Sequence, residues 1–379
     1  MPESAGLLDA TELPRLFDAL RERGYTVVGP TVRDGAIMLA ELGSAAELPY
    51  GWGVVTGAGR YRLHRRSDTA AFANSAGPQS IKDILHPPRA RLWSADRTAD
   101  GVTTTGPDRP PRYAVIGARP CDLAAMAVLD RVLSAGAYPE PIYTARRDGV
   151  FVVAVDCTEP AATCFCTSMG GGPAATGGFD LAMTELADAD GHRFVVRAGS
   201  PAGAEVLSAL CVRAAGPRAE SEARAAVAAA ADAITRSMPD ESLPDLLTGA
   251  RESPHWADVA DRCLTCGNCT MVCPTCFCTT TEDVADLTGE HAERWRRWDS
   301  CFDLDFSYVH GGSVRRSGES RYRQWMSHKL GNWQAQFGSS GCVGCGRCIA
   351  WCPAGIDITE EAAALSAWRR SERAQPCPP

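Results

Sequence analysis

The sequence predicts a mixed α/β domain over residues 1–238, followed by a small, mainly helical domain over residues 255–379. Two observations lead to this division. Strand-like apolar runs alternate with helical stretches in the first segment, which is the pattern of α/β and α+β folds. The second segment concentrates cysteines in two compact groups, separated by a long insertion at 274–341. Residues 239–254 contain several prolines and acidic residues and are predicted to link the two domains.

Composition excludes several classes of function. The chain has 379 residues, enough for two or three domains with a sizeable core. Its formal net charge of −8 disfavours a nucleic-acid partner. No apolar run approaches the roughly 18 residues of a membrane span, and the acidic start MPESAGLLDATELPRLF resembles neither a Sec nor a twin-arginine signal. Because seventeen cysteines occur without an export signal, we expect metal binding in a reducing compartment, the cytoplasm.

The first elements are short and separated by turns. Residues 8–23 are predicted to form an amphipathic helix that ends at Gly24. Strands are expected at 25–29, 36–39 and 61–63. The glycine-rich stretch GWGVVTGAG at 51–59 lacks the spacing G-x-G-x-x-G and a strand-to-helix context. It is therefore predicted to be a loop that does not bind phosphate.

A strand–helix–strand unit follows in the middle of the chain. The apolar run 113–117 (YAVIG) precedes a helix that starts near Pro120, and a second apolar run covers 150–156 (VFVVAVD). This spacing predicts a βαβ unit with two parallel strands. The carboxyl ends of such strands share one edge of the sheet, where open α/β sheets place their sites.

Four cysteines follow these two strands and are expected to meet at that edge: Cys121, Cys157, Cys164 and Cys166. We interpret them as the ligands of an iron–sulfur cluster. A structural zinc ion and a set of buried free thiols are the alternatives, since an unpaired cysteine also packs as a small hydrophobic side chain.

Three further elements lead to the cysteine-rich end. Residues 193–196 are predicted to form a strand, the alanine-rich stretch 219–237 a helix, and residues 255–262 a short helix.

The two cysteine groups share the spacing C-x2-C-x2-C-x3-C-P. The first comb contains Cys263, Cys266, Cys269 and Cys273, and the second comb contains Cys342, Cys345, Cys348 and Cys352. Bacterial ferredoxins with two [4Fe–4S] clusters use this run, and the fourth cysteine of each run binds the other cluster. We therefore predict a ferredoxin-like domain with one cluster on Cys263, Cys266, Cys269 and Cys352, and another on Cys342, Cys345, Cys348 and Cys273. A zinc ribbon needs only four ligands, and cysteines this tightly repeated make a poor disulfide framework.

The insertion carries three more cysteines, Cys276, Cys278 and Cys301. The motif TCFCT occurs at 163–167 and again at 275–279, which suggests similar ligand geometry. Three thiols are one short of a four-cysteine cluster, so metal ligands and thiols that only neighbour a cluster are both open interpretations. Cys211 and Cys377 are predicted to have no metal role.

Basic and aromatic residues are interleaved between 291 and 330. They are Arg294, Arg296, Arg297, Arg315, Arg316, Arg321, Arg323 and Lys329, with Trp295, Trp298, Tyr322 and Trp325. Such a patch could offset the negative charge of the clusters, dock a partner subunit, or form an ordinary solvated face. Nucleic acid is disfavoured here as well.

No motif of substrate chemistry accompanies the cysteines. The chain lacks a dinucleotide fingerprint, a G-x-S-x-G elbow and an H-E-x-x-H motif, and its seven histidines are scattered. We therefore expect single-electron transfer through the clusters, with no substrate site, flavin or nicotinamide on this chain.

Several segments from about residue 80 onward resemble one protein family. They are CLTCGNCTMVCPTCFC, RRWDSCFDLDFSYVHGG, HKL followed by CVGCGRCIAWCPAGI, IGARPCDLAAMAVLD, DCTEPAATCFC and GFDLAMTEL. The family is the iron–sulfur electron-transfer (beta) subunit of cytoplasmic nickel–iron hydrogenases of the sulfhydrogenase type. The segments are equally similar to the corresponding iron–sulfur subunit of anaerobic sulfite reductase.

The resemblance implies a multi-subunit complex that works without oxygen. A separate flavin subunit would exchange hydride with NAD(P)H, and this chain would relay electrons to or from a catalytic hydrogenase or sulfite reductase subunit. The eight comb cysteines match the family's cluster ligands. Seven of the remaining nine match its additional cysteines: Cys121, Cys157, Cys164, Cys166, Cys276, Cys278 and Cys301. Two alternatives are a self-sufficient flavin/iron–sulfur reductase and a non-redox scaffold or sensor.

Overall fold

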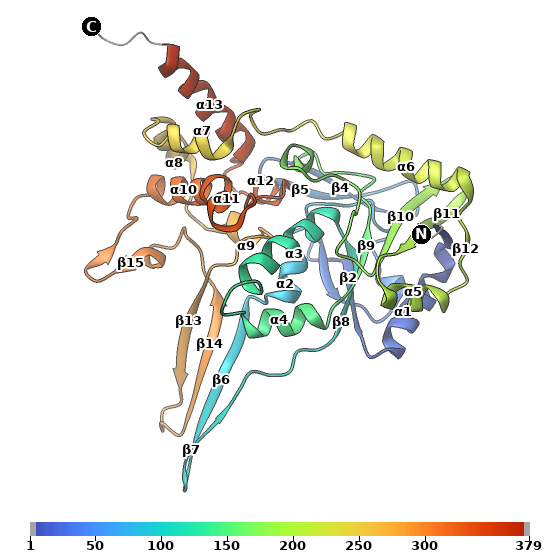
Figure 1. Cartoon of the computed structure of the whole chain (residues 1–379), viewed down its shortest axis with the longest axis horizontal. Coiled ribbons are helices and arrows are strands. Elements are labelled where there is room, and N and C mark those ends of the chain that lie inside the picture. Colours follow the sequence, from blue (N-terminus) through green and yellow to red (C-terminus); the bar gives the residue numbers. More distant parts are fainter. Residues whose placement is uncertain (1–4, 375–379) are drawn as a thin grey trace.

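The computed structural model describes residues 5–374 and is built around an eight-stranded mixed sheet. In spatial order its strands are β12 (Arg213–Ala214), β1 (Gly6–Asp9), β11 (Gly191–Ala198), β10 (Leu181–Asp188), β9 (Phe151–Val155), β8 (Tyr113–Ala118), β2 (Thr26–Arg33) and β3 (Ala36–Glu41). The four strands from β10 to β2 run parallel, and the outer strands pair antiparallel. The sheet is thus a parallel centre with antiparallel borders (Figure 1).

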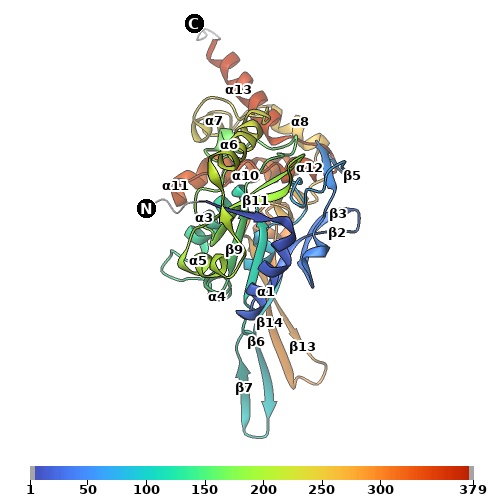
Figure 2. The same ribbon diagram turned by 90° about the vertical axis from the view of Figure 1, so that its right-hand side faces the viewer.

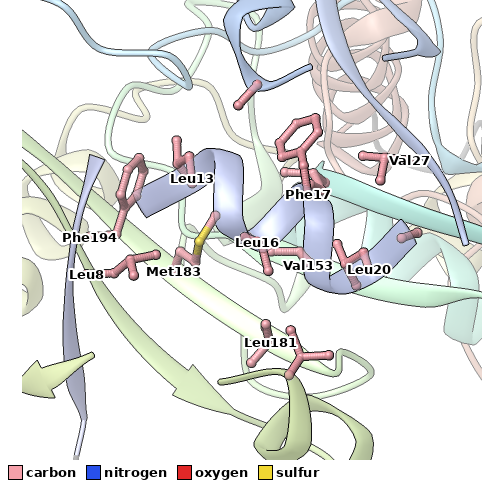
Figure 3. Packing of buried hydrophobic residues seen from close by; sticks show 14 of the residues in the cluster. Leu8, Leu13, Leu16, Phe17, Leu20, Val27, Val153, Leu181, Met183 and Phe194 are labelled. Carbon is pink, nitrogen blue, oxygen red and sulfur yellow. The ribbon is translucent and has the colours of Figure 1, made fainter. Parts of the chain in front are cut away.

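Helices cover both faces of this sheet. On one face lie α1 (Leu13–Glu22) and α5 (Pro201–Ser208), and on the other lie α2 (Ile81–Leu85), α3 (Pro120–Leu133) and α4 (Pro141–Asp148). Figure 3 shows Leu13, Leu16 and Leu20 of α1 packed near Val153, Leu181 and Met183. Neighbouring residues of β9 alternate between the two faces, which explains its continuous apolar sequence.

The predicted βαβ unit is confirmed, since β8 and β9 pair in parallel on either side of α3. The strands expected near 25, 36, 61 and 193 are confirmed as β2, β3, β5 (Arg60–Arg65) and β11. The first helix starts later than predicted. Residues 6–9 form β1 instead, and Asp9 accepts a hydrogen bond from Thr11 N at the start of the turn η1 (Ala10–Glu12).

The prediction of a loop at 51–59 is wrong. Residues Trp52–Gly57 form β4, which pairs with β5 in an antiparallel hairpin. The glycines allow this hairpin to approach the second comb closely. Gly59, with a φ of +66°, donates its backbone N–H to Ile349 O at 3.0 Å. The stretch therefore supports the cysteine-rich region.

A second sheet was not predicted. It has four strands in the order β13 (Thr279–Ala285), β14 (His291–Trp298), β6 (Arg89–Thr98) and β7 (Gly101–Thr105). It projects from the body as a long arm (Figures 1 and 2). Because β14 of the insertion pairs with β6 of the N-terminal segment, the two predicted domains share this sheet.

The cysteine-rich part is helical around its own apolar core. Its helices are α7 (Leu243–Gly249), α8 (His255–Arg262), α9 (Asn268–Met271), α10 (Gly318–Ser327), the π-helical turn η5 (His328–Asn332), α11 (Trp333–Phe337), α12 (Arg347–Ala350) and α13 (Ile358–Ala374). Leu246 and Leu247 of α7 are buried in this core, so the segment predicted as a linker contains a helix that packs with the C-terminal part.

The remaining elements lie at the borders. They are α6 (Gly216–Asp232), which corresponds to the predicted alanine-rich helix, the turns η2 (Ala45–Glu47), η3 (Cys166–Met169) and η4 (Asp305–Ser307), and the small hairpin β15 (Tyr308–Val309) and β16 (Gly312–Ser313). None of the helices within residues 5–374 combines the length and hydropathy that a membrane-spanning helix needs.

Candidate metal centres

Both combs fold in the same way. In each, a left-handed glycine follows the second cysteine and starts a one-turn helix. Gly267 has a φ of +72° before α9, and Gly346 has a φ of +70° before α12. The two short helices contact each other, and Asn268 Nδ2 donates a hydrogen bond to Trp351 O. The combs therefore lie side by side in a similar local conformation.

The first three cysteines of the first comb meet the last cysteine of the second. Cys263, Cys266, Cys269 and Cys352 line one largely apolar cavity, which Cys348 also borders. Backbone N–H groups point at two of these sulfurs: Thr265 N lies 3.4 Å from Cys263 Sγ, and Ile356 N lies 3.3 Å from Cys352 Sγ. Burial raises the pKa of Cys269 well above its usual value. N–H donors around several converging sulfurs suit a thiolate-bound cluster.

The second comb meets Cys273 of the first in the corresponding way. Burial raises the pKa of Cys348 well above its usual value, and the neighbouring thiolates of Cys342, Cys345 and Cys273 raise it further. Gly344 N lies 3.4 Å from Cys342 Sγ. The structure thus brings together the cysteines of both predicted sets, while their role as ligands stays a prediction.

Lys329 lies directly beside the second set. Its Nζ is 3.3 Å from Cys273 Sγ, 3.2 Å from Thr275 Oγ1 and 3.1 Å from Gly341 O, and only 3% of the residue is exposed. A hydrogen bond from Cys276 and the charge of Lys329 hold the pKa of Cys273 well below its usual value. A buried ammonium group in this position suits a negatively charged cluster.

The third set of cysteines lies against the second comb. Cys121 starts α3, Cys157 follows β9, and Cys164 and Cys166 come from the adjoining loop, so all four gather near the carboxyl ends of β8 and β9. Burial raises the pKa of Cys166 to about 11, and the nearby Cys157 and Cys345 thiolates act in the same direction.

Several contacts join this set to the second comb. Phe165 N donates to Gly344 O at 2.8 Å, and Cys164 Sγ lies 3.8 Å from Cys345 O. Arg347 of the comb reaches across, with Nη2 3.1 Å from Asp122 Oδ1 and Nη1 3.9 Å from Cys121 Sγ. The second set therefore lies between the first and the third.

The three cysteines of the insertion line a separate cavity, together with Asp299, His328, Lys329, Trp325 and Trp333. Cys211 lies after α5 and is exposed, 2.7 Å from Arg15 Nη1. Cys377 lies outside the described residues. Within residues 5–374, no three His, Cys, Asp or Glu side chains form a group that could hold a single metal ion.

The basic, aromatic segment 291–330 does not form one surface. Arg294 pairs with Asp283 on the arm at 2.7 Å, whereas Tyr322 and Trp325 are buried in the helical core. The segment therefore does not act as one patch. Lys329 lies beside Cys273, as expected for a charge that offsets a cluster, Arg294 lies on the exposed part of the arm, and the docking of a partner subunit stays a prediction.

Sequence reasoning missed the role of Lys82. This residue is only 1% exposed, and its Nζ donates to Met271 O and Cys276 O, both at 3.2 Å. A signal was present, because Lys82 and Lys329 are the only lysines among the 38 basic residues. Every other basic position is arginine, so a lysine in this chain marks a buried place beside cysteines.

Comparison with known proteins agrees with this geometry. Residues 262–356 match a family described as a 4Fe-4S dicluster domain. The chain is 34% identical over 256 residues to "Sulfhydrogenase 2 subunit beta" of Pyrococcus furiosus, an alignment that covers 65% of this chain and 72% of the relative. No solved structure matches the chain. The extent and identity of this alignment, together with the dicluster domain, show that the chain belongs to the family of iron–sulfur beta subunits of sulfhydrogenases.

Proposed function

We propose that this chain is the electron-relay subunit of a cytoplasmic sulfhydrogenase-type complex. It would carry single electrons between a flavin subunit that reacts with NAD(P)H and a catalytic hydrogenase subunit. The observation that carries this proposal is the arrangement of the three cysteine sets, in which the second adjoins both the first and the third. Likeness to a sulfhydrogenase beta subunit supports the type of complex.

Each set would hold one cluster. Cys263, Cys266, Cys269 and Cys352 would bind the first, Cys342, Cys345, Cys348 and Cys273 the second, and Cys121, Cys157, Cys164 and Cys166 a third. When bound, a [4Fe–4S] cluster accepts and releases one electron at a potential set by its surrounding charge, hydrogen bonds and exposure. The chain's own residues supply these influences: backbone N–H groups at Cys263, Cys342 and Cys352, and the Lys329 ammonium at Cys273.

The first and third cysteine sets, which flank the second set, differ in their access to solvent. In the first set, Cys266 is exposed, and so is the neighbouring Leu264. In the third set, Cys164 and Cys166 are buried. A partner that docks over the loop 263–267 could therefore exchange electrons with the first cluster directly. We assign this loop as one port of the relay.

The experiment is purification of the tagged chain, without oxygen, together with the proteins that bind it. We expect both a nickel-containing and a flavin-containing protein to co-purify, and NAD(P)H to reduce the clusters only when the flavin protein is present. Sirohaem in place of nickel would instead identify the complex as an anaerobic sulfite reductase. Flavin bound to the isolated chain, with direct reduction by NAD(P)H, would contradict the relay and support a self-sufficient reductase.

A further inference from the structure

The cavity lined by Cys276, Cys278 and Cys301 contains three thiols that the three sets above do not use. Its volume is about 100 Å³, compared with about 30 Å³ for the cavity of the first set. This cavity is therefore larger than the one in which the first cluster is proposed to bind.

Hairpin geometry brings these thiols together. Cys276 and Cys278 immediately precede β13, and Cys301 follows β14. These strands pair from Thr279 opposite Trp298, and Asp299 N donates to Cys278 O at 2.9 Å, which extends the pairing to the end of the hairpin that meets the body (Figure 1). The cysteines and the Asp299 carboxylate are thus fixed at one place by the register of the strands.

Two buried lysines border the same place. Both lysines of the chain are at most 3% exposed, and within residues 5–374 no ion pair joins either of them to a carboxylate. Lys329 lines the cavity and also contacts Cys273 of the second set. Lys82 contacts the Cys276 carbonyl, and its Nζ lies 3.6 Å from the centre of the Trp298 ring. A buried ammonium group is costly unless an opposite charge compensates it. Burial lowers the pKa of Lys82, and an anionic group in the cavity would favour its charged form, as the second cluster would for Lys329.

Unpaired donors provide an independent observation. Trp325 and Trp333 line the cavity, and both indole N–H groups are buried without a hydrogen-bond partner among the described residues. Buried polar groups are nearly always paired. The sulfur atoms of an iron–sulfur cluster would accept hydrogen bonds from such donors.

We propose that this cavity binds a further iron–sulfur cluster, with Cys276, Cys278 and Cys301 as thiolate ligands and Asp299 as the fourth ligand. The inference rests on the proposed function, because it adds a centre to the same relay. This centre neighbours both dicluster sites, because Cys276 lies beside Cys273 of the second set and Cys301 lies near Cys269 of the first. It would provide a branch or an additional port where the arm joins the body.

The experiment measures iron and acid-labile sulfide in the whole chain, purified without oxygen and reconstituted, together with the EPR spectrum after reduction. Four four-iron clusters predict about sixteen iron atoms per chain. Cys278→Ser combined with Cys301→Ser should lower this by about four and leave the signals of the two dicluster clusters in place. Cys211→Ser, which changes an exposed thiol away from all four sites, should alter neither quantity.

The outcomes separate this inference from the proposed function. If the double variant contains as much iron as the wild type, or if the cavity binds zinc, the further cluster is overturned and the relay still stands. A wild-type chain without iron would overturn both. Asp299→Asn keeps all thiols and should change only the EPR signal of the further cluster, so an unchanged spectrum rules out the carboxylate ligand. If the cysteine variants do not fold, anomalous scattering at the iron edge is measured on wild-type crystals. An iron peak in the cavity supports the further cluster, and a cavity without one overturns it.

Discussion

At the scale of single residues, Lys329 has the best-defined contact with a predicted cluster ligand. Its ammonium group is buried against the Cys273 sulfur and has no freedom to move into solvent. A positive charge beside a cluster stabilises the reduced, more negative state and therefore raises the reduction potential. The sequence placed this lysine in a basic patch but could not place it beside Cys273, because 56 residues separate the two.

Replacing Lys329 should lower the potential of the second cluster. If Lys329 stabilises the reduced state more than the oxidised state by the amount of one hydrogen bond to a charged group, about 1.5–3 kcal/mol, the decrease is roughly 65–130 mV for one electron at 59 mV per tenfold change. Redox-titrated EPR of Lys329→Met should show this decrease, whereas Arg323→Met on the exposed side of α10 should leave all potentials unchanged. Equal potentials in wild type and Lys329→Met would disprove the tuning role.

The third set is tested by its two loop cysteines. Cys164 and Cys166 are buried and adjoin the second comb. If they bind a four-iron cluster, Cys164→Ser combined with Cys166→Ser should lower the iron content by about four atoms per chain. Iron and sulfide analysis of the variant measures the iron content, and the EPR signals of the two dicluster clusters show whether the variant has folded. Unchanged iron would mean that these thiols only pack, as the alternative interpretation from the sequence holds.

At the scale of elements, the sequence was most informative where structure is local. The βαβ unit follows from two apolar runs and a helix adjacent in sequence, and both combs follow from their spacing. The arm could not be predicted, since β6 and β14 lie far apart in the chain and their mostly half-exposed residues lack a strong apolar pattern. The strand β4 was missed because the glycines at 51–59, which allow close packing on the second comb, resemble a loop.

The contact between the second comb and the third set depends on Gly346. This glycine is left-handed, and a Cβ atom there would overlap the carbonyl oxygen of Thr163, next to Cys164. Gly338 has a similar φ of +68°, but a Cβ there would meet nothing within 4 Å. The two positions therefore form a matched pair, in which only Gly346 adds a steric clash to the cost of the backbone conformation.

Gly346→Ala should destabilise the protein more than Gly338→Ala. The left-handed conformation alone costs an alanine about 1–2 kcal/mol, and the displaced loop at Thr163 adds to this only in the first variant. Urea unfolding without oxygen gives the free energies, and iron analysis reports whether the third set is disturbed. Equal losses of stability and iron in the two variants would show that the comb and the loop do not depend on this contact.

At the scale of the whole molecule, a buried histidine, His86, lies where the arm meets the body. His86 precedes β6, stacks on Trp298 with ring centroids 6.5 Å apart, and both of its ring nitrogens lack a partner among the described residues. Burial lowers its pKa to about 3, and the positive charges of Arg296 and Lys82 act in the same direction. Between pH 6.5 and about 3, the imidazole therefore stays neutral in the folded protein but takes up a proton in the unfolded chain.

Stability should consequently fall with pH below about 6.5. Between the unfolded pKa of about 6.5 and the folded value of about 3, each pH unit removes about 1.4 kcal/mol through His86. Urea unfolding at pH 7.5 and pH 5.5 should show this loss in the wild type, and a smaller one in His86→Gln, which cannot take up the proton. The same pH dependence in both proteins would assign the effect to other groups.

The central claim is that the combs bind two neighbouring [4Fe–4S] clusters that exchange electrons. The measurement that tests it most directly is iron and sulfide analysis with redox-titrated EPR on the whole chain, purified without oxygen. We predict at least eight iron atoms per chain, from the two four-iron clusters of the combs, and a reduced spectrum broadened by magnetic interaction between adjacent clusters. A colourless protein that binds zinc, or one that holds about four iron atoms or fewer after reconstitution, would contradict the account.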